Sequence, residues 1–196
     1  MTVEPQRVPR EGASDPDLAD VRAAQRDRAA FGALYRRYVD RVYGYCFYLL
    51  GDHHDAEDAT ERTFTAALAA VDGFRDEGAT FRAWLFRIAH NQLANALRSR
   101  DRQRAASLEV VAEPRANADP AGILSLAEEA RGLRRALDQL PVDRRQVVVL
   151  RFVDGLSARE IGAVIGRSEG AVRVLQHRAL RQLAEMLATG GDGPTV

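Results

Sequence analysis

The sequence predicts an all-α protein made of two small helical domains that a flexible linker joins. Apolar residues recur at three- and four-residue steps through most of 17–104 and 123–188, which is the spacing of amphipathic helices. Residues 105–122, which lie between them, contain two prolines, many small residues and a slight acidic excess, as is typical of a linker. We expect the polar ends, 1–16 and 189–196, to be disordered.

The composition allows two real cores but gives the chain no overall charge. Hydrophobic residues make up 46% of the 196 residues, and 28 acidic residues balance 28 basic ones. Every basic residue is an arginine, a bias typical of GC-rich genomes, so the abundance of arginine is not by itself evidence of function. Any affinity for nucleic acid must therefore come from local clusters of charge.

Neither a disulfide nor a membrane segment is predicted. Cys46 is the only cysteine, and its apolar surroundings in the sequence suit a core position in a reducing compartment. No apolar run approaches the roughly 20 residues that span a bilayer, and residues 1–16 contain no signal-peptide core. We expect a soluble cytoplasmic protein without membrane insertion.

Two helices are predicted between Asp17 and Gly51. The pattern indicates a first helix, a break near Asp27 and a longer helix that ends at Gly51. The aromatic residues of this segment could form a base-stacking platform, but their helical spacing favours a core. The periodic positions are Leu18, Val21, Phe31, Leu34, Tyr35, Tyr38, Val42, Tyr45 and Leu49.

The densest acidic segment, Asp52–Glu61, opens the next predicted helix. Carboxylates in a first turn stabilise the helix dipole, which explains part of this density. His54 and Asp58 stand four residues apart and could share a metal ion, with His53, Asp55 and Glu57 close by. No second set of ligands appears elsewhere in the sequence, so we predict no metal site.

A polar loop, Gly73–Thr80, leads into a long helix predicted over 81–104. At 1.5 Å per residue this helix is more than about 30 Å long, and Trp84 with four aliphatic residues supplies its buried side. Four arginines near its end exceed what the dipole of a helix C-terminus requires, so we expect phosphate contacts there. They are Arg98, Arg100, Arg102 and Arg104.

The second domain is predicted to begin with a helix over 123–140 that ends before a proline. Asp143 with Gln146 is similar to a capping box and starts another helix, which passes through Phe152 and stops at Gly155.

Residues 155–183 predict two helices joined by a tight turn. Ser157 and Glu160 form a capping box at the first helix. Gly166 supplies a left-handed residue at its end, and Ser168 caps the next helix. The arrangement is either an ordinary αα-hairpin or a helix-turn-helix, whose second helix enters the major groove of DNA.

The second of these helices has an apolar stripe and a basic opposite side, which favours the DNA-binding interpretation. The stripe, expected to pack inward, is Val172, Leu175, Ala179, Leu180 and Leu183. The opposite side is Gly170, Arg173, Val174, His177, Arg178 and Arg181.

Taken in order, these segments resemble the extracytoplasmic-function sigma factors, the smallest members of the sigma-70 family, which carry regions two and four. The resemblance extends from Ala30 to Leu187. Its motifs are FGALYRRY at Phe31–Tyr38, DAEDATERTF at Asp55–Phe64, FRAWLFRIAHN at Phe81–Asn91, LPVDRRQVVVLRF at Leu140–Phe152, and the helix-turn-helix. It implies a bacterial transcription initiation factor with no catalytic activity and no cofactor, with 17–104 as region two and 123–188 as region four.

The resemblance implies that the helix over Asp55–Phe64 docks on the clamp helices of the largest subunit of core RNA polymerase. Its carboxylates could pair with basic groups of that partner. The implied contacts are Asp55, Asp58, Glu61 and Phe64, of which Glu61 departs from the glutamine usual in the family.

The resemblance also implies that the first domain binds the minus-ten promoter element, partly as melted single-stranded DNA. A loop captures a base that is flipped out during melting. Its residues here are Arg75, Asp76, Glu77, Gly78, Ala79 and Thr80. Arg82, Phe86, Arg87 and Asn91 line the path of the strand, while Trp84 packs beneath it.

By the same resemblance, the helix-turn-helix reads the minus-thirty-five element as duplex DNA. Arginine pairs with guanine and valine contacts a thymine methyl group. The implied residues are Arg173, Val174, His177 and Arg178 for bases, and Ser168 with the helix start for a phosphate. Leu175 and Gln176 depart from the pattern of many relatives.

Further expectations and alternatives accompany this interpretation. We expect an anti-sigma factor as an additional partner, and a linker that mimics a nucleic-acid chain near the polymerase active centre. One alternative is a stand-alone helix-turn-helix regulator, although the first domain shows no receiver or ligand module. A metal-dependent hydrolase is the other, although the chain has no nucleophile elbow and no phosphate-binding glycine loop.

Overall fold

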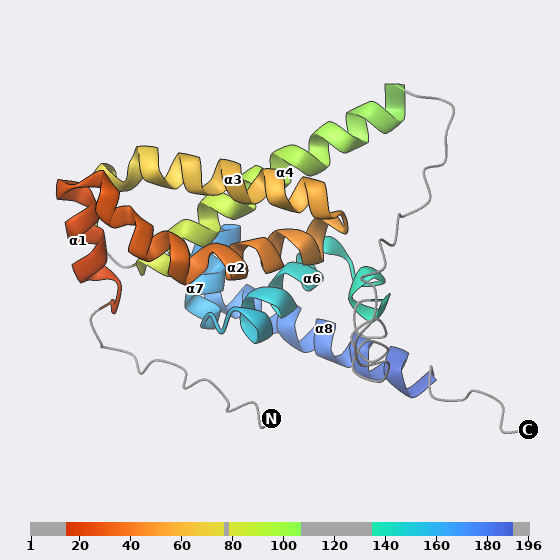
Figure 1. Cartoon of the computed structure of the whole chain (residues 1–196). Coiled ribbons are helices and arrows are strands. Elements are labelled where there is room, and N and C mark those ends of the chain that lie inside the picture. The colour runs from red at the N-terminus through yellow and green to blue at the C-terminus, as the bar shows by residue number, and fades with distance from the viewer. Residues whose placement is uncertain (1–14, 77–78, 107–134, 190–196) are drawn as a thin grey trace, which may run out of the picture.

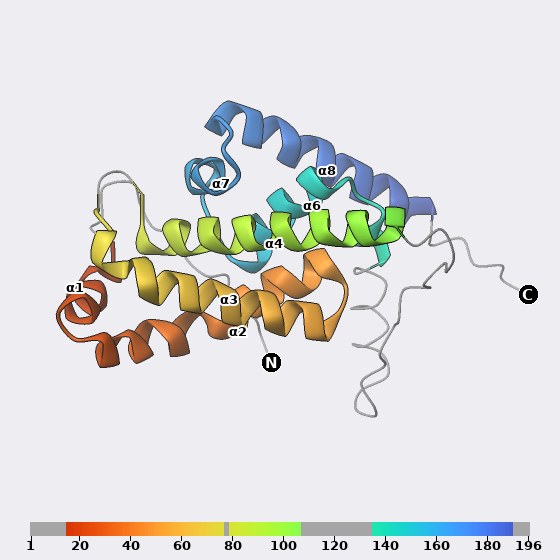
Figure 2. The ribbon, with the colours of Figure 1, turned by 90° about the horizontal axis from the view of Figure 1, so that it is seen from above.

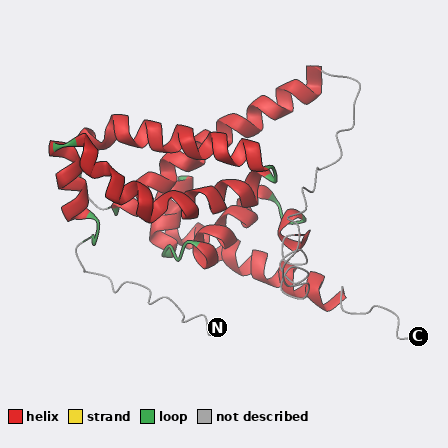
Figure 3. Cartoon of the chain, viewed as in Figure 1, coloured by secondary structure: helices red, strands yellow, loops and turns green. Residues whose placement is uncertain are grey.

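The computed structural model describes residues 15–76, 79–106 and 135–189, with side chains for all of these except 99–106 and 187–189. The described residues form helices and turns without any strand, as the sequence predicts (Figure 3). The elements are α1 (Leu18–Arg26), η1 (Arg28–Ala30), α2 (Phe31–Leu50), α3 (His53–Ala70), η2 (Val71–Gly73), α4 (Phe81–Ala106), α6 (Val142–Val148), η3 (Val149–Val153), α7 (Ala158–Ile165) and α8 (Glu169–Thr189).

Helices α2, α3 and α4 form the body of the first domain (Figure 1). Helix α2 ends at Gly51, whose N–H donates to the carbonyl of Phe47 over 2.9 Å. Asp52 then caps α3 by accepting a hydrogen bond of 3.1 Å from the N–H of Asp55. Cys46 is fully buried between these helices, which confirms its predicted core position.

The short helix α1 is held against this body by buried carboxylates. Asp17 accepts hydrogen bonds from Arg37 and from the hydroxyl of Tyr38, both on α2. Asp15 accepts from the N–H of Phe81 and so caps the start of α4 across the fold. These contacts place the loop before α4 next to α1.

The second domain differs from the sequence prediction at the start of helix α6. Helix α6 begins after Pro141, and no side chain caps it, so the capping-box prediction for Asp143 and Gln146 is wrong. Gln146 is 9% exposed and packs inside, where it cannot reach back to the helix start. The helix continues as the single π-helical turn η3, which leaves Phe152 58% exposed.

The turn between α7 and α8 has the predicted local structure. The capping box of Ser157 and Glu160 is present, and Gly166 has a φ of +68°. Gly162 is required for a different reason: a Cβ there would lie 2.5 Å from the carbonyl oxygen of Arg167. The chain can therefore turn tightly only because position 162 has no side chain.

The apolar stripe of α8 is mostly buried. Val172 and Ala179 are fully buried, and Leu183 is 8% exposed. Leu180 is 42% exposed, so its predicted core position is wrong. It lies three residues after His177, which puts it on the exposed side of the helix.

The two predicted domains pack against each other. Helix α4 lies between α3 on one side and α7 on the other (Figure 2). Leu156, Ile161 and Val164 of the second domain belong to the same buried cluster as Leu85 and Phe86 of α4. The linker predicted between the domains lies outside the described residues, apart from its first two, which belong to α4.

Candidate nucleic-acid and polymerase interfaces

The expected duplex-reading surface lies on the first three turns of α8. The hydroxyl of Ser168 accepts a hydrogen bond of 3.2 Å from the N–H of Ala171, so this serine caps the helix as predicted. Beyond the cap, four residues are exposed on one face: Arg173, Val174, His177 and Arg178.

This surface is available for binding because its charged groups have only local partners. Arg173 pairs with Glu169 one turn earlier on the same helix. Neither His177 nor Arg178 has an ion pair or hydrogen bond to another described side chain. Val174 is 49% exposed, which presents an apolar contact among polar neighbours.

The loop expected to capture a base borders a cavity of about 490 Å³. Arg75 and Asp76 line it and are exposed, whereas Glu77 and Gly78 lie outside the described residues. Arg75 donates hydrogen bonds to the carbonyls of Asp72 and Phe74 over 2.8 and 2.9 Å. Ala79, which follows, is half-buried.

Helix α1 forms the other wall of this cavity, which sequence reasoning missed. Arg22 and Gln25 line it from α1. The amide nitrogen of Gln25 donates to the carbonyls of Val71 and Phe74 over 3.0 and 3.1 Å and so holds the start of the loop. The sequence carried one sign that Gln25 faces inward: it follows Val21, which is buried, by one helical turn.

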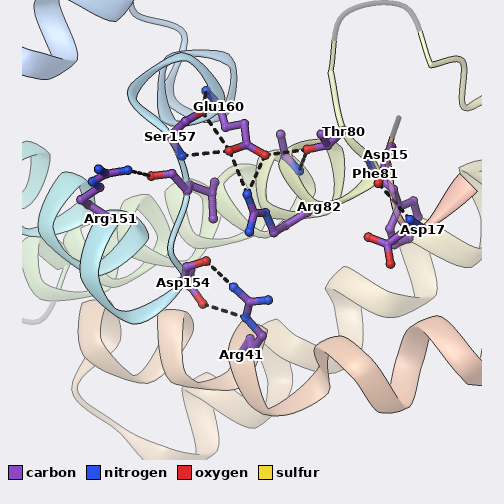
Figure 4. A network of polar contacts seen from close by, with 12 residues as sticks. Asp15, Asp17, Arg41, Thr80, Phe81, Arg82, Arg151, Asp154, Ser157 and Glu160 are labelled. Atoms are coloured by element: carbon purple, nitrogen blue, oxygen red, sulfur yellow. Dashed lines mark hydrogen bonds and ion pairs between the residues drawn. The ribbon is translucent and has the colours of Figure 1, made fainter. Parts of the chain in front are cut away.

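Arg82 and Thr80 point toward the second domain (Figure 4). Nη2 of Arg82 lies 2.8 Å from each carboxylate oxygen of Glu160, and both side chains are only 15% exposed. The hydroxyl of Thr80 donates to the same carboxylate over 2.8 Å. Burial acts to raise the pKa of Glu160, but the hydrogen bonds from the main chain of Ser157 and from Arg82 together outweigh it and lower this pKa, so the carboxylate is ionised.

The other residues expected along the minus-ten path differ in exposure. Arg87 and Asn91 are exposed on α4, as their expected role requires. Phe86 is fully buried, with its ring edge-on to Tyr45 at 5.6 Å. Its expected position along the DNA is therefore corrected, because the ring fills the core between α2 and α4. Trp84 packs on Phe74 and Phe81, as predicted.

The predicted phosphate contacts at the end of α4 are described in part. Arg98 is exposed, and its hydrogen bonds to described residues go to Ala94 and Asn95 of its own helix. The side chains of Arg100, Arg102 and Arg104 lie outside the described part of the structure.

A second polar contact between the domains was not foreseen from the sequence. Asp154 is fully buried, and its Oδ1 lies 3.7 Å from Nε of Arg41 on α2. The Arg41 guanidinium also donates to the main-chain carbonyl of Asp154. Burial raises the pKa of Asp154 to about 7, although the positive charges of Arg41 and Arg82 act in the opposite direction.

The expected polymerase-binding surface borders an apolar groove of about 660 Å³ between α2 and α3. Glu61 and Phe64 line the groove, whereas the half-buried Asp55 and the exposed Asp58 lie on the same helix outside its lining. Phe64 is 5% exposed and packs edge-on against Tyr35 at 4.8 Å. Tyr35, which the sequence had indicated only as a core residue, is 45% exposed here.

The two histidines near Asp52 each lie against a neighbouring side chain. His54 lies 3.8 Å from a carboxylate oxygen of Glu57, and the ring of His53 packs against Phe47 at 4.3 Å. Among the residues described, no group of three or more potential ligands is placed to hold a metal ion. Likewise, no helix within those residues is both long and apolar enough to cross a membrane.

Comparison with known families matches both halves of the chain. The model of Sigma-70 region 2 matches residues 34–103, and that of Sigma-70 region 4 matches residues 130–183.

Individual sigma factors are similar to this chain along most of its length. The chain is 36% identical over 184 residues to the ECF RNA polymerase sigma factor BldN of Streptomyces coelicolor, which covers 91% of this chain and 70% of that protein. It is 36% identical over 183 residues to the ECF RNA polymerase sigma factor SigE of Mycolicibacterium smegmatis, a match that covers 91% of this chain and 70% of SigE.

Two solved structures share the fold. One is the sigma factor RpoE in complex with the anti-sigma factor NepR from Bartonella quintana, with a TM-score of 0.70 and 28% identity over 83% of this chain and 98% of that one. The other is CnrH in complex with the cytosolic domain of CnrY, with a TM-score of 0.66 and 30% identity. That match covers 92% of this chain and 100% of the CnrH chain.

Proposed function

Since this chain belongs to the extracytoplasmic-function sigma factors of the sigma-70 family, we propose that it binds core RNA polymerase and directs it to promoters with two DNA-binding surfaces. One surface reads the minus-thirty-five element and the other binds the minus-ten element and assists its melting. The observation that carries this proposal is the exposed face of α8, where cationic and apolar groups follow a capped helix start.

At the minus-thirty-five element, α8 lies in the major groove. Arg173 leaves its ion pair with Glu169 and pairs with the edge of a guanine, and Val174 contacts a thymine methyl group. His177 and Arg178 donate to bases or phosphates, and the start of α8 at Ser168 faces a phosphate.

At the minus-ten element, the segment Arg75–Thr80 holds a flipped base beside α1. The cavity of about 490 Å³ has polar walls, as recognition of a base edge requires. Arg82, Arg87 and Asn91 bind the strand on α4, and Arg98 with Arg100, Arg102 and Arg104 supplies phosphate contacts along the same helix.

The clamp helices of the polymerase dock over the groove between α2 and α3. The groove offers an apolar floor at Phe64 and an exposed carboxylate at Glu61, with Asp55 and Asp58 nearby. Apolar burial supplies affinity there, and the carboxylates set orientation. These are functions of an initiation factor without chemistry of its own, which acts in the cytoplasm where the polymerase works.

An anti-sigma factor is a further proposed partner. The similar RpoE of Bartonella quintana was solved in complex with the anti-sigma factor NepR, and it matches 83% of this chain. A protein that covers the groove or the α8 face would hold the factor inactive.

Transcription in vitro tests this proposal. Purified bacterial core polymerase is supplied with a pool of genomic fragments, with and without this chain. We expect new transcripts that start a fixed distance downstream of a shared two-part motif. Failure to bind core, combined with sequence-specific DNA binding by the chain alone, would instead support the stand-alone regulator.

The docking surface has its own matched test. Glu61→Arg should abolish binding to core polymerase, because it reverses the charge beside the groove. Asp143→Arg makes the same charge change at an exposed position of α6 and should leave binding intact. Equal losses in both variants would contradict the assignment of the groove.

A further inference from the structure

The cavity beside the base-capturing segment has one wall that lies outside the match to the region 2 family. This wall belongs to α1, which ends at Arg26, whereas the model of Sigma-70 region 2 begins at residue 34. The residues of α1 that line the cavity are Leu18, Val21, Arg22 and Gln25. Those of the facing wall are Asp72, Phe74, Arg75 and Asp76. The role of the α1 wall must therefore be argued from its own residues.

Hydrogen bonds join the two walls into one unit. The amide nitrogen of Gln25 donates to the carbonyls of Val71 and Phe74 over 3.0 and 3.1 Å. The N–H of Phe74 donates to the carbonyl of Val71 over 3.0 Å, which closes the turn between those two contacts. The ring of Phe74 is held in turn by Phe81 and Trp84. Helix α1 therefore sets the position of the facing wall, and the cavity forms without DNA.

The cavity has an apolar floor and a charged rim. Val21 and Phe74 are its most buried lining residues, at 1% and 5% exposed, so they form the floor. Its volume of about 490 Å³ lies in the range of pockets that hold small organic ligands. An unstacked base has a flat apolar body and a polar edge, and it fits a cavity of this kind.

Two charged groups on opposite walls are available to a base. Arg75 donates to the main-chain carbonyl of Asp72 over 2.8 Å, and the carboxylate of Asp72 lies 3.6 Å from Nη2 of Arg28. Arg22 and Asp76, by contrast, are exposed and make no ion pair or hydrogen bond with the residues that the structure describes. The α1 wall thus offers a donor, and the facing wall offers an acceptor.

This arrangement favours some bases over others. A guanidinium donates to the carbonyl and ring-nitrogen acceptors of a base, and a carboxylate accepts from an exocyclic amine. Adenine, cytosine and guanine each carry such an amine beside an acceptor. Thymine has a carbonyl at both ends of its pairing edge, so one carbonyl would face the carboxylate of Asp76. The cavity therefore suits a base with an exocyclic amine and disfavours thymine.

We propose that Arg22 of α1 binds an acceptor of the captured base while Asp76 accepts from its amine, so that the pair determines which base is captured. The proposal rests on the function assigned above, because it takes the flipped base to enter this cavity. It adds to the minus-ten interface a residue of α1, which lies apart from both the base-capturing segment and α4. A contact with the base differs measurably from a contact with phosphate, which is the same for every sequence.

The test uses the full chain bound to core polymerase, on a promoter found by transcription. The captured position is located by moving 2-aminopurine through the non-template strand of the minus-ten element, because the fluorescence of this base rises when it leaves the stack. Three pre-melted DNAs then carry cytosine, uracil or an abasic site at that position. Cytosine and uracil differ in the amine and its neighbouring ring nitrogen, without the methyl group of thymine, and competition gives their relative affinities.

We expect Arg22→Ala to weaken binding of the cytosine DNA at least about fivefold and to leave binding of the abasic DNA nearly unchanged. The wild-type chain should bind cytosine at least about fivefold more tightly than uracil. Asp76→Asn should reduce that preference, because an amide can donate to the uracil carbonyl. Arg26→Ala is the matched control, since Arg26 is exposed one turn further along α1 and does not line the cavity. It should affect all three DNAs alike.

Equal losses on cytosine and abasic DNA in Arg22→Ala would overturn the proposal, because they would show a contact with the strand backbone. Unchanged binding of cytosine in that variant would also overturn it, as would a preference for cytosine that Asp76→Asn leaves intact. Circular dichroism checks that Arg22→Ala folds, which we expect because the residue is exposed and alanine favours helices. Failure of the proposed function is distinguishable: 2-aminopurine would then show no unstacked position with the wild-type chain and polymerase.

Discussion

The two DNA-binding surfaces of this protein use similar residues in opposite settings. On α8, Arg173 is exposed and pairs with Glu169 of its own helix. On α4, Arg82 is 15% exposed and pairs with Glu160, which lies 78 residues away in the other domain. An exposed pair one turn apart contributes little and exchanges readily for DNA. A shielded pair between domains makes DNA binding depend on how the domains are arranged.

The difference shows that exposure, and not residue type, decides which surface is ready to bind. Both surfaces are rich in arginine, but on the minus-ten surface Arg82 is shielded by α7, whereas Arg173 and Arg178 on the face of α8 are exposed. Arg82 and Thr80 are engaged by Glu160 of α7 and are not free to contact DNA in this arrangement. A factor built in this way can meet duplex DNA first and melted DNA later.

The largest predicted effect comes from a substitution that disrupts the turn before the exposed face of α8. Gly162→Ala places a methyl group 2.5 Å from the carbonyl oxygen of Arg167, a main-chain atom that cannot move without opening the turn. We expect a loss of about 3 kcal/mol in the unfolding free energy of the second domain, measured by denaturant titration with circular dichroism.

Gly44→Ala is the matched control for this substitution. A Cβ at Gly44 meets nothing within 4 Å, and the residue lies inside α2, so alanine should stabilise the helix by about 0.5–1 kcal/mol. If Gly162→Ala were as stable as the wild type, the turn would not require a glycine.

The next effect tests whether the exposed face reads sequence. Arg173→Ala should cost about 1–3 kcal/mol at one or two base pairs of the minus-thirty-five element, measured by competition between promoter variants. Arg100→Ala should weaken binding equally on all sequences if that side chain contacts phosphate. If Arg173→Ala weakened binding equally on every sequence, the face of α8 would not read bases through this residue.

The local features of both surfaces could be predicted from the sequence, because each is encoded within a few residues. The capping box of Ser157, the left-handed Gly166 and the exposed face around Arg173 all follow from patterns shorter than three helical turns. Leu180 was wrongly placed because it lies at the border between two helix faces, where periodicity alone does not decide the side. Phe86 was placed along the DNA by the family resemblance alone, and its ring is fully buried in the core.

The contacts between the domains could not be predicted in the same way. Glu160 has a complete local explanation as a capping residue, so nothing in its neighbourhood suggests a second partner. Arg41 and Asp154 are 113 residues apart, and neither belongs to a recognisable motif. Such pairs depend on how whole domains pack, and a periodic pattern does not carry that information.

The smallest predicted effect concerns how tightly the two domains pack against each other, which should depend on pH. Asp154 faces Arg41, and the other ionisable groups near it are Arg82, Tyr45 and Cys46. Burial raises the pKa of Cys46 to about 12 and that of Tyr45 well above 10, so both stay neutral between pH 6 and 8. Glu160, with its lowered pKa, stays ionised over the same range. Asp154 is therefore the member of this group that titrates.

The sign of the effect follows from the raised pKa of Asp154. In the closed arrangement, with α7 packed against α4, its pKa is about 7, and separation of the domains would expose it to water and return the pKa toward its ordinary value of 3.8. The closed state therefore takes up a proton that the open state does not, and it gains stability as the pH falls. Between pH 8 and pH 6 the ratio of closed to open protein should rise about tenfold.

X-ray scattering at constant ionic strength measures this ratio without DNA, so ionisation at the DNA interface does not contribute. The wild-type chain should become more compact from pH 8 to pH 6. Asp154→Asn should remove the dependence, because asparagine has no proton to exchange. Expansion of the wild-type protein over the same range would show that another group controls closure, since a buried carboxylate can only favour the closed state as it is protonated.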